Sequence, residues 1–126
     1  MASPYSPLLD TDINKKFVTD YRQKFGVTPQ EPIAHPYDAC NIFLHALQAT
    51  GGDTTPAVLR DAMVNVDFMG VEGRIRFDHA TKCRINDIYM CKVDKVNGEY
   101  MWVPVYTYKD VPPVGFAPPP APPSGK

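Results

Sequence analysis

The spacing of apolar residues changes once along this chain, close to Asp67, and the change separates a helical part from a strand-forming part. Upstream of Asp67, apolar residues recur at helical spacing in three separate segments. Downstream, apolar and polar residues alternate, or strand-forming residues gather in short runs. The sequence therefore predicts three helices followed by strands.

The first predicted helix covers residues 12–25, where Ile13, Phe17 and Tyr21 lie on one face. Asp10 or Asp12 can cap its start, and the glycine at position 26 can end it. Residues 28–36 then contain three prolines, which predicts an extended connection rather than a helix.

The second predicted helix begins at Pro36, because a first turn does not need the N–H that proline lacks. Its apolar face continues to Leu47, and Gly51-Gly52 stops it. A third, short helix follows Thr55-Pro56 and ends near Val64.

Strand patterns follow. Residues 74–77 alternate polar with apolar, as a half-buried strand does, and Gly70 and Gly73 before them permit a turn and a close crossing of chains. Two further runs, residues 87–93 and 100–105, flank Asn97-Gly98. Both residues of this pair tolerate a positive φ, so the sequence predicts a β-hairpin there.

Composition excludes several classes of partner. The chain has 126 residues, 44% of them hydrophobic, and its 13 basic and 14 acidic residues give a formal net charge of -1. This balance predicts no nucleic-acid partner and no anionic membrane partner. The first five residues lack the basic start and apolar stretch of a secretory signal, so we expect no signal peptide in the chain as given.

The C-terminal segment, residues 112–126, is rich in proline and offers few apolar groups to bury. We expect an extended or disordered tail. It is either a spacer without a partner or a linker or docking peptide for a polyproline-binding groove.

Catalytic and metal sites are not predicted. Cys40, Cys83 and Cys91 show no paired spacing, so buried free thiols are expected, with a Cys83–Cys91 disulfide as the alternative. No pair of histidine or cysteine residues has the spacing that pre-arranges zinc ligands, and no nucleotide-binding or nucleophile motif is present. The carboxylates of Glu72, Asp78 and Asp87 are expected to be solvated.

Three runs carry a resemblance to a known family: residues 17–26, Pro36-Tyr37-Asp38-Ala39, and residues 68–78 with the sequence FMGVEGRIRFD. In order and spacing they resemble the C-terminal third of the type I periplasmic binding proteins of the leucine/isoleucine/valine-binding kind. These proteins feed amino acids and related small molecules to ABC transporters. The resemblance extends from about Tyr5 to about Tyr106.

The resemblance implies an α/β fold that forms part of a two-lobed protein. Residues 1–111 are then the C-terminal part of a solute-binding domain, with first-lobe helices in residues 5–70 and the hinge, strands and hairpin in residues 71–108. Residues 112–126 are the tail.

The resemblance also implies a ligand-contact segment before the second helix, at Ala34, His35, Pro36 and Tyr37. A helix N-terminus there would suit a substrate carboxylate. Tyr37 is either a stacking residue or a core aromatic, and Asp38 is expected as a first-turn acidic residue. For His35, ligand contact and simple solvent exposure remain alternatives.

The function implied is that of a non-enzymatic solute-binding component of an ABC transporter, which captures amino acids or related carboxylates by hinge closure and presents them to a permease. No cofactor is implied, and the parent protein would be periplasmic. The alternative is a structural or interaction subunit that reuses the fold. Because helix faces that normally lie on a sheet would be exposed, a homo-oligomer or a complementary chain is expected.

Overall fold

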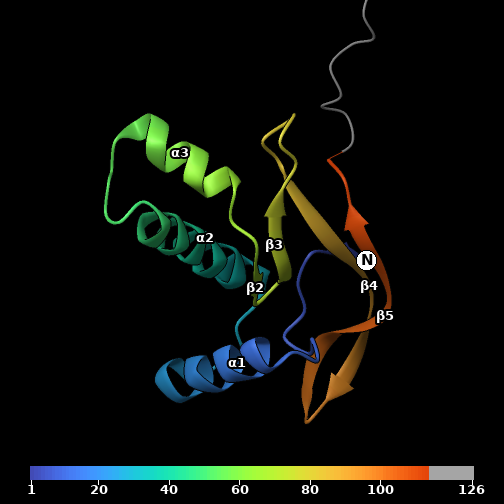
Figure 1. Cartoon of the computed structure of the whole chain (residues 1–126). Helices are drawn as coiled ribbons and strands as arrows, with labels where there is room; N and C mark the ends of the chain where they lie inside the picture. The colour runs from blue at the N-terminus through green and yellow to red at the C-terminus, as the bar shows by residue number, and fades with distance from the viewer. Residues whose placement is uncertain (114–126) are drawn as a thin grey trace, which may run out of the picture.

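A long strand, β4 (Arg84–Val96), lies at the centre of an antiparallel sheet, and the helices pack on one side of that sheet (Figure 1). The structure is a computed structural model and describes residues 1–113. Within those residues the other elements are β1 (Ala2–Ser3), α1 (Asp12–Phe25), α2 (Glu31–Ala49), α3 (Pro56–Val64), β2 (Phe68–Gly70), β3 (Gly73–Phe77) and β5 (Glu99–Val111). The predicted fold class, three helices followed by short strands and a hairpin, is confirmed. The predicted tail lies outside the described residues from position 114 on.

Both edges of β4 are paired. Along one edge β4 pairs with β5, and along the other it pairs first with β3, through Phe77 opposite Arg84, and then with β1, through Ser3 opposite Tyr89. β2 extends the sheet beyond β3. The chain start therefore lies beside the C-terminal hairpin.

The hairpin turn forms at the predicted residues. Asn97 has a φ of 51° and Gly98 a φ of 89°, the positive values that a two-residue turn with the twist of the strands requires. The strands of the hairpin extend beyond the runs seen in the sequence, to 13 residues each.

α1 has the predicted bounds but a different cap. Thr11, rather than Asp10 or Asp12, accepts the hydrogen bond from the backbone N–H of Asn14. Gly26 ends the helix in the left-handed region with a φ of 73°, and its N–H donates to the carbonyl of Arg22 over 2.8 Å.

The prediction for residues 28–36 is wrong, because α2 begins at Glu31 and includes both Pro32 and Pro36. Pro32 lies in the first turn, where its missing N–H costs nothing. Pro36 removes one hydrogen bond inside the helix, at a cost of about 3 kcal/mol. Continuing the helix through Pro36 places Ala34 and Asp38, both almost fully buried, on the inner face. The number of prolines in the segment says nothing about this burial, so the prediction based on the prolines missed the start of the helix.

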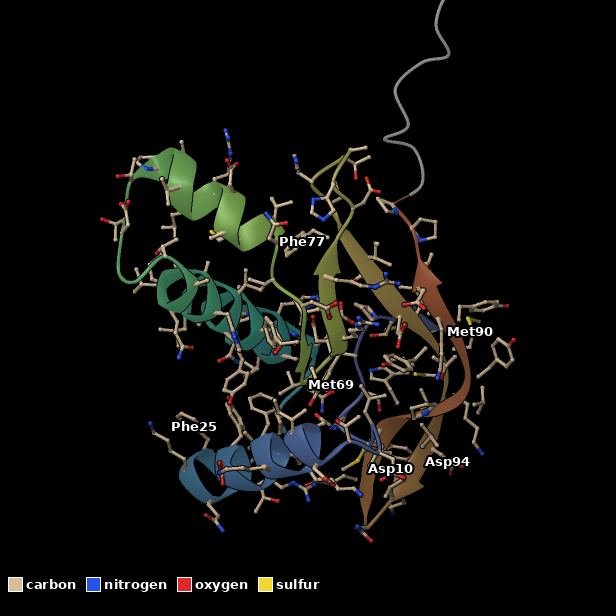
Figure 2. The ribbon with its side chains drawn as sticks, viewed as in Figure 1. Asp10, Phe25, Met69, Phe77, Met90 and Asp94 are labelled. Carbon is tan, nitrogen blue, oxygen red and sulfur yellow. The ribbon has the colours of Figure 1, made fainter. Side chains whose placement is uncertain are left out.

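Two clusters of buried side chains hold the helices against the sheet. The first core cluster joins α1, α2, the chain start and β4, and consists of Tyr5, Leu9, Phe17, Ala34, Val71, Tyr89 and Cys91. The second core cluster joins α2, α3 and β3 and centres on Ala46, Val66 and Ile75. Figure 2 shows Phe77, at the end of β3, lying beside α3, as expected of a residue packed against the second cluster.

Apolar side chains of α2 remain exposed, as the sequence predicted for helix faces that lack their sheet. Phe43 is 41% exposed and Leu44 is 57% exposed. None of the helices within residues 1–113 is long and apolar enough to cross a membrane.

Replacing Gly70 by alanine is expected to lower the free energy of unfolding by about 2 kcal/mol. A Cβ at this position would lie 2.6 Å from Oδ2 of Asp38 and 2.8 Å from its Cγ, so the turn would have to move. Urea unfolding measures the effect. Gly26→Ala is the matched control: its Cβ would meet no atom within 4 Å, so only the cost of its φ, about 1 kcal/mol, is expected. Equal losses in both variants would contradict the role of the Asp38 contact.

Candidate functional site

The carboxylate of Asp38 binds the backbone of the turn between β2 and β3. Oδ1 accepts a hydrogen bond from the N–H of Val71 and Oδ2 one from the N–H of Glu72, both over 3.0 Å. Asp38 is only 1% exposed. It lies well inside α2, so its interpretation as a first-turn residue is wrong: it caps a turn of another element.

Burial raises the pKa of Asp38, and the nearby Glu72 carboxylate adds to this effect. The two backbone N–H donors and the guanidinium of Arg84 act in the opposite direction. Gly70 lets the carboxylate approach the turn, because any side chain there would occupy the same space.

Glu72 is the centre of a polar cluster rather than a solvated residue, so this prediction too is wrong. Its side chain is fully buried, and its carboxylate forms ion pairs with Arg84 of β4 and with Nδ1 of His35 of α2. Its backbone carbonyl accepts a hydrogen bond from the Tyr89 hydroxyl over 3.3 Å. Burial raises the pKa of that hydroxyl to about 12, so it remains a donor at physiological pH.

The chain start joins the same cluster through Ser3. The Ser3 hydroxyl lies 2.5 Å from Oε2 of Glu31, in the first turn of α2, and Oε1 of Glu31 lies 3.3 Å from Nε2 of His35. The charged groups thus alternate in sign from Glu31 to His35, Glu72 and Arg84 when the imidazole is protonated. We call these four residues the charge chain.

The four residues predicted for ligand contact lie within α2 and not in a turn before it. Ala34 is completely buried, so its side chain has no access to a ligand from solvent. Pro36 is exposed, and Tyr37 is 43% exposed with its ring centroid 4.6 Å from that of Phe17. The side chain of His35 is 46% exposed and belongs to the charge chain.

Two grooves flank this segment. One, between α1 and α2, has a volume of about 480 Å³ and is lined mostly by aromatic and apolar side chains, among them Phe17, Tyr21, Phe25, Ile33, Pro36 and Tyr37. The other, about 360 Å³, lies at the N-terminus of α2 and is lined by Tyr5, Gln30, Glu31, Pro32 and Trp102, with Met1, Ser3 and Pro7. Trp102 packs on the first core cluster and also lines this second groove.

No group of three or more histidine, cysteine or acidic side chains within residues 1–113 is placed to hold a metal ion. Cys40, Cys83 and Cys91 are all free, so the alternative of a Cys83–Cys91 disulfide is not realised. Only Cys91 is buried, and the expectation of buried thiols is wrong for the exposed Cys40.

The comparisons with known proteins agree with this architecture. Residues 1–99 match the model of a family described as "Periplasmic binding protein". A search of curated proteins gave no match.

Solved structures match over most of the chain. A solute-binding protein of an ABC transporter from Rhodopseudomonas palustris, in complex with 3,4-dihydroxybenzoic acid, is 31% identical with a TM-score of 0.83, over 87% of this chain and 30% of that one. An ABC transporter substrate-binding protein from Sphaerobacter thermophilus is 24% identical with a TM-score of 0.82, over 88% and 31%. An ABC transporter substrate-binding protein from Desulfitobacterium hafniense, in complex with Leu, is 25% identical with a TM-score of 0.64, over 81% and 30%. The chain therefore spans less than a third of the length of these structures.

Replacing Asp38 by alanine is expected to lower the free energy of unfolding by about 2–5 kcal/mol, because two buried backbone N–H groups lose their acceptor. Chemical denaturation monitored by circular dichroism measures the loss. Asp61→Ala, at an exposed carboxylate of α3, is the control and is expected to change stability by less than about 1 kcal/mol. A similar small change at Asp38 would show that the turn does not depend on its carboxylate.

The raised pKa of Asp38 also predicts a pH dependence. Above the ordinary aspartate value of 3.8, the unfolded chain releases this proton while the folded protein still holds it, so the contribution of Asp38 to stability falls as pH rises. We expect the difference in unfolding free energy between wild type and Asp38→Asn to shrink from pH 4 upward. Urea titrations at several pH values test this, and parallel curves for the two proteins would refute it.

Proposed function

The chain belongs to the periplasmic binding protein family, and from this premise we propose that it is the C-terminal portion of the solute-binding component of an ABC transporter. The observation that carries the proposal is the match of 87% of the chain, at 31% identity, to one such component. The family and these structures are transport proteins and not enzymes. The role proposed is accordingly capture and delivery without chemical conversion.

We propose a small carboxylate as the solute. The ligands of two similar structures, 3,4-dihydroxybenzoic acid and leucine, differ in shape and polarity but share a carboxylate. An amino acid or an aromatic acid is thus the class to test.

The proposed contact segment is Ala34, His35, Pro36 and Tyr37 in the N-terminal half of α2. The exposed His35 supplies a ring N–H for a carboxylate, whereas Pro36 and Tyr37 supply an apolar surface beside the α1–α2 groove. Ala34 contributes by its small size, since it lets α2 approach the first core cluster without a gap.

The mechanism proposed for the complete protein is closure of two lobes on the solute by hinge motion, followed by delivery to a membrane permease in the extracytoplasmic space. Residues 5–70 would belong to the first lobe, and residues 71–108 would include the last hinge crossing and the hairpin. Most of the remaining surface of such a cleft would come from residues beyond those of this chain.

A second candidate function is a structural or interaction subunit that does not bind solute. The exposed Phe43 and Leu44 on α2 favour it, because an uncovered apolar helix face promotes association. Light scattering with and without solute separates the two. A complementary chain or a homo-oligomer that tightens with solute supports the first function, and association that ignores solute supports the second.

His35→Ala is expected to weaken binding of leucine or of 3,4-dihydroxybenzoic acid by about tenfold, the loss of about one charge-assisted hydrogen bond. Isothermal titration calorimetry measures the dissociation constant. His79→Ala, in the exposed turn after β3, is the matched control and is expected to bind like wild type. Equal affinities in wild type and His35→Ala would remove His35 from the contact segment, and a wild type that binds neither solute would count against the solute class proposed.

A further inference from the structure

We propose that Glu72 is a positioning residue for His35, with Arg84 holding its carboxylate from the other side; the ligand part of this inference rests on the proposed function. The side chain of Glu72 has no access to solvent, so a ligand that arrives from solvent does not reach it directly. Its effect passes through the imidazole ring.

Contacts of both the backbone and the side chain of Glu72 fix the position of its carboxylate. The backbone N–H donates to Asp38, the backbone carbonyl accepts from the Tyr89 hydroxyl, and the carboxylate is paired with Arg84, whose side chain is only 18% exposed. Three separate elements, α2, β4 and the β2–β3 turn, therefore determine where this carboxylate lies. The imidazole ring of His35 pairs with this carboxylate, so the position of the ring is defined as well.

The two ring nitrogens of His35 meet different surroundings. Nδ1 faces the buried Glu72, whereas Nε2 lies 3.3 Å from the carboxylate of Glu31, whose side chain is 37% exposed. Nδ1 is thus the anchored end of the ring and Nε2 the open end. A solute carboxylate that approaches from solvent meets Nε2 and takes the place of Glu31.

Charge supports the same arrangement. One carboxylate lies beside each ring nitrogen, Glu72 beside Nδ1 and Glu31 beside Nε2, and both nitrogens can donate at once only in the imidazolium form. When a solute carboxylate replaces the Glu31 carboxylate at Nε2, the signs of the charges in the charge chain still alternate. The Glu31 side chain is 37% exposed, so water can hydrate the oxygen that leaves Nε2.

The test removes the buried pair as a unit, with the substitutions Glu72→Met and Arg84→Met together. Removing Glu72 alone would leave the Arg84 charge without its partner, which destabilises more than replacing both groups by apolar ones. The control is Asp67→Leu with Arg74→Met, which removes a more exposed bidentate pair of 2.7 Å and 2.6 Å between the residue before β2 and β3, with no contact to His35.

The first readout needs no solute. Proton–nitrogen NMR of the histidine side chains is expected to show the same chemical shifts for the His35 ring nitrogens in wild type and in the control, and shifted values in the Glu72/Arg84 variant, where the ion-pair contact at Nδ1 is gone. His45 and His79 provide internal references, since neither ring pairs with a carboxylate in the described residues. An unchanged His35 signal in the Glu72/Arg84 variant would overturn the proposal.

The second readout is affinity for leucine and for 3,4-dihydroxybenzoic acid. We expect the Glu72/Arg84 variant to bind about tenfold more weakly, and His35→Gln added to it to cause no further loss, because both changes remove one interaction. Independent, additive losses would overturn the positioning role. If wild type binds neither solute but the NMR result is as expected, the role of His35 in ligand binding is refuted together with the proposed function. The positioning of the His35 ring by Glu72 is then still supported.

Discussion

The bond between the Asp38 carboxylate and two backbone N–H groups of the β2–β3 turn is the constraint on which the rest of the structure depends. It joins the middle of α2 to two backbone N–H groups that lie 33 and 34 residues further along the sequence. By fixing the turn it also places Glu72, and through Glu72 both His35 and Arg84. Burying a carboxylate raises the free energy of the folded state unless its oxygens accept hydrogen bonds, so an arrangement that lacks these two hydrogen bonds is strongly unfavourable. Such a contact specifies one arrangement of helix and sheet.

The sequence predicted what depends on neighbours along the chain. α1 and α3 have the expected bounds, and Asn97-Gly98 forms the expected turn, because spacing and backbone preference act locally. The start of α2 was missed because the burial of Ala34 and Asp38 outweighs the preference of Pro36, and that burial involves distant residues.

The site was harder to predict for the same reason. The contact segment was proposed only through the family resemblance, and its grouping with Glu72 and Arg84 was not foreseen. Glu72 looks like an ordinary surface acid in a glycine-flanked turn, and only the fold brings Arg84 and His35 to it. One signal was present in the sequence. Gly70, two residues before Glu72, indicated that another group approaches the backbone closely there, but the sequence did not show that this group is the Asp38 carboxylate.

The pairing of β1 with β4 has a consequence for the order of folding. The amino group of Met1 donates to the carbonyl of Cys91, a separation of 90 residues, and closing a loop of that length costs about 4 kcal/mol of chain entropy. Only two residues of β1 pair to offset it. We therefore expect β1 to dock after the helices and the hairpin have formed, and to be the first element to open. Since Ser3 holds Glu31 from this strand, the polar surface around His35 is completed only when the two distant segments meet.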